Sequence, residues 1–132
     1  MTLNHLRFPI VCLVLLTAFS SCFSNKANLD NNTSLLANCW THSYEDNTDE
    51  RETYLPCDAK DFQPSRYRAQ FTLAENGTCT FSVLAANDAH TSDTGTWTYD
   101  SETKTLIMKG SNGVVAHSYV IEVLEPVRIL LK

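Results

Sequence analysis

The sequence contains little positive charge, no apolar stretch long enough to span a membrane, and no paired metal-ligand motif. Its 10 basic residues against 15 acidic ones give a formal charge of −5, which argues against nucleic acid and against tight docking on anionic lipid. A membrane-spanning helix needs about 20 apolar residues, and Cys-X2-Cys or His-X3-His spacing would mark a zinc site. The chain has neither an excess of basic residues, nor an apolar stretch of this length, nor a zinc-ligand motif. We therefore expect no nucleic acid partner, no transmembrane helix, no metal ion and no cofactor.

Catalytic patterns are equally scarce. Three histidines follow the N-terminal segment, His42, His90 and His117, but none stands at a supporting distance from Cys57 or Asp58. Cysteine–histidine catalysis needs a strained turn or a helix N-terminus to activate the thiol, and a chain of strands and short turns offers little of either. We expect His42 and His117 to lie on strand faces with a satisfied hydrogen bond. The sequence therefore predicts neither a catalytic residue nor an enzyme.

The first 21 residues have the layout of a signal peptide. Arg7 supplies a positive charge, and residues 8–19 form an apolar run without any charge. The small residues Ser20 and Ser21 precede Cys22, and this end resembles the lipobox at which bacterial lipoproteins are cut and lipidated. The resemblance implies that Cys22 becomes the first mature residue and carries a thioether-linked lipid with acyl chains such as palmitate. The alternative is an ordinary secretory signal that is cleaved near Ser20 and leaves Cys22 unmodified.

Residues 22–37 are polar and rich in asparagine and show no strong period, which is typical of a tether. We therefore expect a signal peptide at 1–21, a polar tether at 22–37 and one folded domain at 38–132. Attachment to a membrane would come from the lipid on Cys22 alone. The expected location is the cell envelope, on the outer membrane, with the periplasmic side favoured because no acidic run follows Cys22.

Cysteine counting leaves three of the five thiols for the folded domain. Cys12 leaves with the signal peptide and Cys22 would carry lipid, so Cys39, Cys57 and Cys79 remain. Three cysteines cannot all pair internally, so the options are one disulfide with one free thiol, or no disulfide. Counting does not choose the pair. We favour Cys39 with Cys57, because Cys79 lies in a strand pattern as a small apolar residue and buried free cysteines are common.

Beyond Ala37 the hydrophobic pattern alternates with a period of two almost everywhere, which is typical of strands with one buried face. The clearest hairpin joins 66–73 to 78–84, because Asn76-Gly77 accepts the positive φ of a tight turn. The remaining strands are expected at 40–44, 53–55, 94–99, 105–109, 114–124 and 127–131, with long loops at 56–65 and 85–93. About eight strands and no helical period predict an all-β, up-and-down meander, whose edges are best hidden by closing into a barrel.

Five short motifs carry a family resemblance: Trp40 in the first strand, Leu55-Pro56-Cys57-Asp58, Asn87-Asp88-Ala89-His90, Gly95-Thr96-Trp97-Thr98-Tyr99-Asp100 and Lys104-Thr105-Leu106. From about Cys39 to Lys132 the chain resembles the small lipocalin-like domains of Gram-negative lipoproteins. The resemblance implies a small barrel with room for an apolar cavity and no established activity. Lipocalins place an arginine of the last strand over the first-strand tryptophan. We therefore expect Arg128 to close one end of the barrel by a cation–π contact with Trp40; the alternative is a solvated strand arginine.

Five aromatic residues share the predicted inner faces: Tyr67, Phe71, Phe81, Trp97 and Tyr99. They are either core or the lining of a ligand cavity, because a small eight-stranded barrel can be filled by side chains or hold one small ligand. Short strands and bulky residues favour a largely filled interior. We expect a lipid-anchored, non-enzymatic, lipocalin-like envelope protein with room for a small apolar ligand at its mouth. The alternative is a protein–protein interaction module with a filled barrel and no ligand.

Overall fold

The computed structural model describes residues 31–48, 50–87 and 89–132. In these ranges the chain forms eight strands, one short α-helix and one 3-10 turn, so the prediction of an all-β domain is confirmed. The elements are α1 (Asn31–Leu36), β1 (Cys39–His42), η1 (Tyr44–Asp46), β2 (Glu52–Pro56), β3 (Gln70–Leu73), β4 (Thr78–Leu84), β5 (His90–Asp100), β6 (Thr105–Lys109), β7 (Val115–Glu125) and β8 (Arg128–Leu131).

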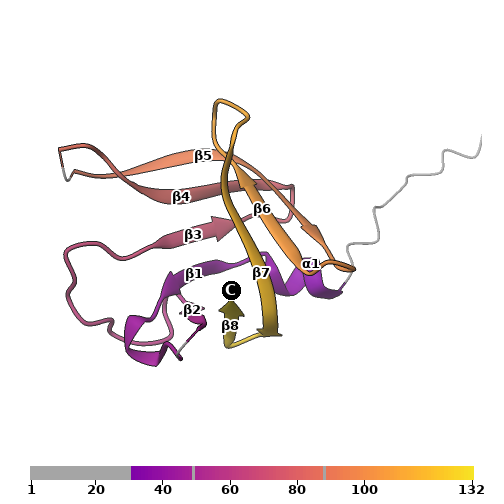
Figure 1. Ribbon diagram of the computed structural model, residues 1–132, viewed down its shortest axis with the longest axis horizontal. Helices are drawn as coiled ribbons and strands as arrows, with labels where there is room; N and C mark the ends of the chain where they lie inside the picture. The colour runs from indigo at the N-terminus through magenta and orange to yellow at the C-terminus, as the bar shows by residue number, and fades with distance from the viewer. Residues whose placement is uncertain (1–30, 49, 88) are drawn as a thin grey trace, which may run out of the picture.

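The strands close into a barrel in the order β1, β2, β8, β7, β6, β5, β4, β3, with all the neighbours antiparallel. Strands β3 to β8 follow one another as the predicted up-and-down meander (Figure 1). The β1–β2 hairpin is inserted in reverse, because β2 pairs with β8 and β1 pairs with β3. The connection at 57–69 must therefore pass from β2 across β1 to reach β3.

The β3–β4 hairpin forms where the turn residues predict it. Gly77 has a φ of 83°, and the Asn76 side chain accepts a hydrogen bond from the Thr78 N–H at 3.0 Å. This turn pairs Phe71 with Phe81 across the hairpin and continues the pairing to Leu73 and Cys79. Because side chains alternate along a strand, the register places these apolar residues together on the inner face.

Two strands begin four residues away from the predicted start, and the strand expected at 40–44 ends at His42, before the 3-10 turn η1. Strand β5 begins at His90 rather than at residue 94, and its first part, paired with the end of β4, is exposed on both faces. The two strands project from the barrel there as an arm (Figure 1). Their backbones pair without an alternating pattern of apolar residues, so the sequence pattern did not mark this part of β5. Strand β3 begins at Gln70 rather than at residue 66. Strand β1 ends at His42, whose N–H donates a hydrogen bond to the Ala69 carbonyl. Residues 66–68 run past this end of β1 and are therefore not part of β3.

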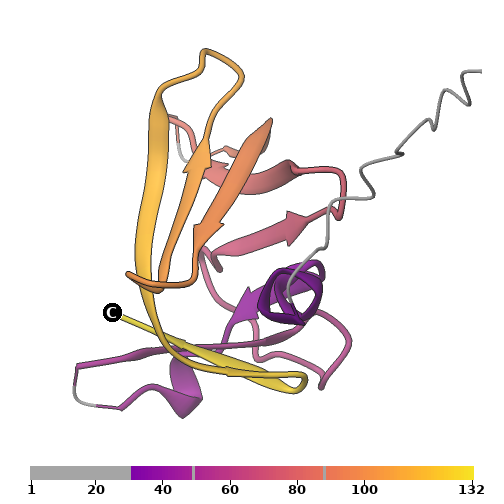
Figure 2. The same cartoon turned by 90° about the vertical axis from the view of Figure 1, so that its right-hand side faces the viewer.

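Helix α1 covers one end of the barrel (Figure 2). Leu36 is fully buried, and its carbonyl accepts a hydrogen bond from the Trp40 indole at 3.0 Å. The last part of the predicted tether, 31–37, is therefore packed against the fold, whereas 22–30 lie outside the described residues. A helix of six residues is too short to show a period in the sequence. The core that it caps contains Leu36, Trp40, Tyr54, Phe71, Leu73, Cys79, Phe81, Trp97, Leu106, Met108, Ile121, Ile129 and Leu131.

Candidate functional site

The five predicted lining residues divide between core and loop. Phe71, Phe81 and Trp97 are buried in the core, and the Trp97 indole donates a hydrogen bond to the Ala74 carbonyl at 2.8 Å. Tyr99 is partly buried and packs against the same cluster. Tyr67 lies outside the strands in the 57–69 connection, where its hydroxyl donates to the Ser82 carbonyl at 3.1 Å. The structure therefore brings three of these residues together as core, and only Tyr67 reaches the loops.

A chain of aromatic contacts fills the barrel beyond the α1 end. His42 stacks on Tyr54 with ring centroids 4.8 Å apart, and Tyr54 contacts Phe71 at 5.2 Å. Tyr119 lies 6.4 Å from Phe71 and stacks on His117 at 5.7 Å. Tyr54 is almost fully buried, whereas Tyr119 and His117 are half-buried. The aromatic interior thus becomes accessible toward this end.

Burial keeps these rings uncharged. It lowers the pKa of His42 and of His117, and it raises the pKa of the Tyr54 and Tyr119 phenols. The Tyr119 hydroxyl lies 3.2 Å from His117 Nδ1, and the Tyr54 hydroxyl donates to the Glu52 carboxylate at 3.4 Å. At neutral pH the cluster therefore presents aromatic faces and neutral hydrogen-bonding groups.

A hollow of about 510 Å³ lies at the loop end of the barrel and is lined by Tyr44, Arg66, Tyr67 and Leu84. We call it the mouth hollow. Tyr44 and Leu84 are 41% and 48% exposed, which is high for large apolar side chains. The Tyr44 hydroxyl donates to the Tyr67 carbonyl at 3.2 Å and so ties η1 to the 57–69 connection. Sequence reasoning found only Tyr67 here, because Leu84 and Arg66 stand at the ends of alternating runs.

Arg68 holds the 57–69 connection beside this hollow. Its guanidinium donates to the His42 carbonyl at 2.7 Å, to the Gln63 carbonyl at 2.6 Å and to both carboxylate oxygens of Glu45. It also lies over the Tyr44 ring, 5.2 Å from the centroid. The Arg68 guanidinium lowers the pKa of the Glu45 carboxyl to about 2, so the pair stays charged across the physiological pH range.

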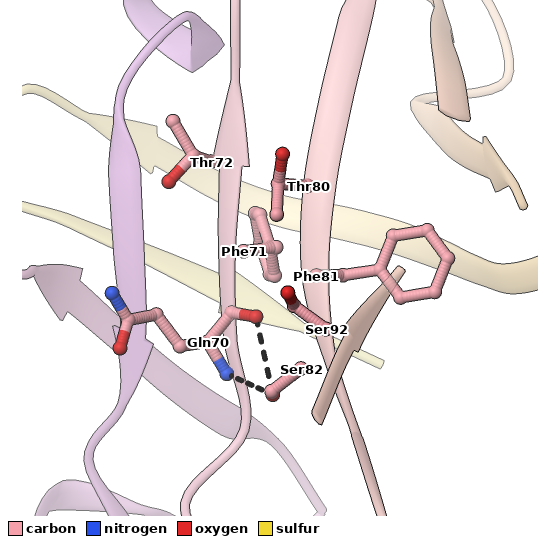
Figure 3. A pocket seen from close by; sticks show the side chains of 7 residues that line it. All are labelled: Gln70, Phe71, Thr72, Thr80, Phe81, Ser82 and Ser92. Carbon is pink, nitrogen blue, oxygen red and sulfur yellow. Dashed lines mark hydrogen bonds between the residues drawn. The ribbon is translucent and has the colours of Figure 1, made fainter. Parts of the chain in front are cut away.

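A separate hollow of about 220 Å³ lies on the outer wall of β3 and β4 (Figure 3). The Ser82 hydroxyl bonds both backbone groups of Gln70, accepting from its N–H at 2.9 Å and donating to its carbonyl at 3.2 Å. None of the lining side chains titrates near neutral pH, so the hollow offers no acid–base group. It is lined by Gln70, Phe71, Thr72, Thr80, Phe81, Ser82 and Ser92.

A disulfide joins Cys39 to Cys57, the pair favoured by the sequence, and Cys79 is a buried free thiol. The bond lies on the outside of the barrel, where the Gln70 side-chain amide donates to both sulfurs at 3.2 Å. It fastens the start of the 57–69 connection to β1. Burial raises the pKa of the Cys79 thiol, as expected of a small core residue.

The predicted barrel-closing pair is not brought together. Trp40 faces inward and bonds the Leu36 carbonyl, whereas Arg128 is exposed and donates to the Glu125 carboxylate at 2.9 Å. The reason is strand alternation: Ile129 and Leu131 of β8 are buried, so Arg128 points to the outer face with Leu130. In place of an arginine, helix α1 covers Trp40.

Two parts of the sequence analysis concern residues outside the described ranges. They are the predicted lipidation site Cys22 with its signal peptide, and Asp88 of the Asn87-Asp88-Ala89-His90 motif. Among the residues that the structure describes, no three histidine, cysteine or acidic side chains cluster to hold a metal ion. No helix within 31–132, apart from the undescribed 49 and 88, is long and apolar enough to cross a membrane.

Comparison of the chain with protein-family models, with curated proteins and with solved structures finds no match. The resemblance to lipocalin-like domains therefore stays a prediction from the sequence.

Proposed function

We propose that this chain is a lipid-anchored, non-enzymatic envelope protein whose barrel binds a small apolar ligand in the mouth hollow. One observation carries the proposal: Tyr44, Tyr67 and Leu84 present apolar surface around a hollow of about 510 Å³, and two of them are more than 40% exposed. Ligand sites are concave and mostly apolar, with a few polar groups that orient the ligand. Arg66 supplies such a group at the rim.

The packing of the interior supports a ligand at the mouth rather than deep in the barrel. Trp40, Leu106 and Met108 are fully buried and fill the interior of the barrel. Close packing of this kind leaves no room for a ligand of useful size. The ligand would instead cover the outer rings of the aromatic cluster, beside the 57–69 connection.

The anchoring part of the proposal rests on the N-terminal sequence. The apolar run and Cys22 resemble a lipoprotein signal, and the Cys39–Cys57 disulfide is typical of a protein exported to an oxidising compartment. A lipid with several acyl chains holds a protein durably, so the barrel needs no membrane-binding face of its own. The proposed location is the outer membrane, facing the periplasm.

Ligand binding is tested on the purified protein by native mass spectrometry and by titration with a fluorescent fatty acid. We expect a bound apolar probe, and Leu84→Asp should weaken its binding at least tenfold, about 1.4 kcal/mol, because a carboxylate would enter the hollow. Val127→Asp is the matched control, since Val127 is 67% exposed in the β7–β8 turn. Absence of probe binding to the unaltered protein would refute a ligand site at the mouth.

Anchoring is tested by replacing Cys22 with serine and fractionating the cells. The variant should release a folded barrel into the soluble fraction. Retention of the processed variant in the membrane fraction would contradict the lipid anchor.

A protein–protein interaction module is the second candidate, and the tip of the β6–β7 hairpin favours it. Val114 and Val115 are 62% and 50% exposed there, beside the turn glycine Gly113. Cross-linking from this tip to an envelope protein, together with a clean apo mass, would support this function over ligand binding.

A further inference from the structure

A second hollow with mixed chemistry lies on the outer wall, where η1 meets β2 and β8. Its volume is about 410 Å³, and its lining combines two leucines, two threonines, one acid and one arginine. It shares no lining residue with the mouth hollow, so a ligand bound here is independent of the proposed function. The lining residues are Asp46, Thr48, Thr53, Leu55, Arg128 and Leu130.

The register of β2 and β8 assembles the floor of this hollow. Thr53 pairs with Leu130, and alternation along β2 puts Leu55 on the same outer face as Thr53. Leu55 and Leu130 are half-buried, so they offer apolar surface that is still accessible. Arg128 lies on this face because it stands two residues before Leu130.

Arg128 reaches the hollow with most of its donors unused. An arginine has five N–H donors in a planar fork, and Nε of Arg128 donates to Glu125 Oε2 at 2.9 Å. Its two terminal nitrogens have no hydrogen-bond partner within 31–48, 50–87 and 89–132. The side chain is 48% exposed. A planar fork of this kind matches a carboxylate in bidentate fashion.

Asp46 supplies the opposite charge at the other side of the hollow. Its Oδ2 atom accepts hydrogen bonds from the Ser43 hydroxyl and the Lys60 ammonium, both at 2.7 Å. The Oδ1 atom accepts no hydrogen bond from the residues that the structure describes. The Lys60 ammonium lowers the pKa of the Asp46 carboxyl, so the carboxylate is ionised at neutral pH. Its free oxygen can accept from an ammonium group.

The two charges line one hollow, and this limits the size of the ligand. Asp46 lies beside Thr53, whose hydroxyl donates to the Asp46 carbonyl at 2.8 Å, and Arg128 is two residues from the partner of Thr53. Two strand residues span roughly 7 Å between Cα atoms, so Asp46 and Arg128 stand on neighbouring parts of the wall. A single α-amino acid carries its ammonium group and its carboxylate on one carbon atom, and it can therefore present one group to each side of the hollow. Each further residue of a peptide would move the two groups roughly 3.4 Å farther apart.

We propose that this hollow binds a free apolar α-amino acid in its zwitterionic form. Arg128 holds the carboxylate, Asp46 accepts from the ammonium group, and Leu55 and Leu130 contact the side chain. Both charged residues are half-exposed and keep one ionic partner within the protein, so each contributes modestly. We expect a dissociation constant on the order of 1 mM for leucine.

The test follows backbone amide shifts by NMR during titration of the purified protein with four probes. L-leucine carries all three recognition elements, and 4-methylpentanoate lacks the amine. L-leucinamide lacks the carboxylate, and glycine lacks the side chain. Leucine should shift the amides of Thr53, Leu55 and Leu130, whereas each other probe should bind at least about tenfold more weakly. Equal binding of 4-methylpentanoate and leucine would overturn the role of Asp46 and hence the proposal.

Variants separate recognition from folding. Arg128→Gln and Asp46→Asn should each weaken leucine binding at least about tenfold, and Lys109→Gln should leave it unchanged because Lys109 is an exposed cation outside the hollow. If Asp46→Asn disturbs η1, the four probes on the unaltered protein still decide whether the hollow recognises both charged groups of leucine. No leucine shift at a concentration on the order of 50 mM would also overturn the proposal.

Discussion

The two ends of this barrel use similar aromatic residues but bury them to different extents. At the α1 end Trp40 is fully buried under Leu36, and Trp97 is 6% exposed. Toward the mouth Tyr119 and His117 are half-buried, and Tyr44 at the rim is 41% exposed. A helix covers the first end, whereas only loops surround the second. The difference shows how one barrel can separate a stabilising end from an end available to a ligand.

The hydrogen bonds of the two ends differ in one contact. At the α1 end both indoles donate to backbone carbonyls, Trp40 to Leu36 and Trp97 to Ala74. The Tyr44 and Tyr67 hydroxyls at the mouth also donate to backbone carbonyls, but the Tyr119 hydroxyl meets the His117 side chain. Backbone acceptors are held by the fold, whereas side chains can exchange partners with a ligand. The contact between Tyr119 and His117 is therefore the one that can rearrange on binding.

The largest effect should come from Trp40→Ala at the covered end. Removing a fully buried tryptophan leaves a cavity and deprives the Leu36 carbonyl of its donor, so unfolding should become easier by about 3 to 5 kcal/mol. Tyr119→Ala is the matched change at the mouth and should reduce stability by only about 1 to 2 kcal/mol. Urea denaturation measures both. Equal losses would show that the two ends do not differ in stability.

The next effect tests the clamp that fastens the 57–69 connection to the barrel. Replacing both Cys39 and Cys57 with alanine opens a disulfide whose cysteines are 18 residues apart in sequence, which should destabilise the protein by about 3 kcal/mol. Thermal unfolding with and without a dithiol reductant measures this. The reductant should lower the unfolding temperature of the unaltered protein and have no effect on the double variant. A drop in both proteins would show that the reductant acts on something other than this disulfide.

A smaller effect is expected from Arg68→Ala beside the mouth hollow. The variant loses hydrogen bonds to the His42 and Gln63 carbonyls, and we expect a loss of about 2 kcal/mol with faster amide exchange in 57–69. Lys60→Ala is the control, because its pair with Asp46 is exposed and should change stability by less than about 0.5 kcal/mol. Unchanged exchange in Arg68→Ala would mean that another contact holds the connection.

The smallest effect concerns the pH dependence of the mouth. Burial lowers the pKa of His117, so the folded protein binds this proton less readily than the unfolded chain, whose histidine has an ordinary pKa of about 6.5. Stability is therefore full above that value and falls as the pH drops through it toward the lower folded pKa. His117→Gln should reduce this slope between pH 7 and pH 5 in urea titrations. A slope that the substitution leaves unaltered would contradict the burial of His117.

Local chemistry in the sequence predicted much of the wall of the barrel. Alternation placed Phe71 with Phe81 on one face, and Asn76-Gly77 predicted the turn that sets their register. The same pattern marked Cys79 as a core residue, which left Cys39 to pair with Cys57 as the favoured option. These predictions succeed because a period of two and a glycine with positive φ are properties of a few neighbouring residues.

Other features depend on contacts between distant parts of the chain. The sequence did not predict that β1 pairs with β3 while β2 pairs with β8, because alternation shows which residues share a face but not which strands lie side by side. It placed Arg128 over Trp40, whereas the closed barrel turns Arg128 to the outer wall. The mouth hollow and the hollow beside Arg128 each combine separate elements. The sequence alone thus determined the strands and their inner faces. The tertiary structure decided which strands are neighbours and where the hollows lie, because barrel closure depends on pairing across the whole barrel.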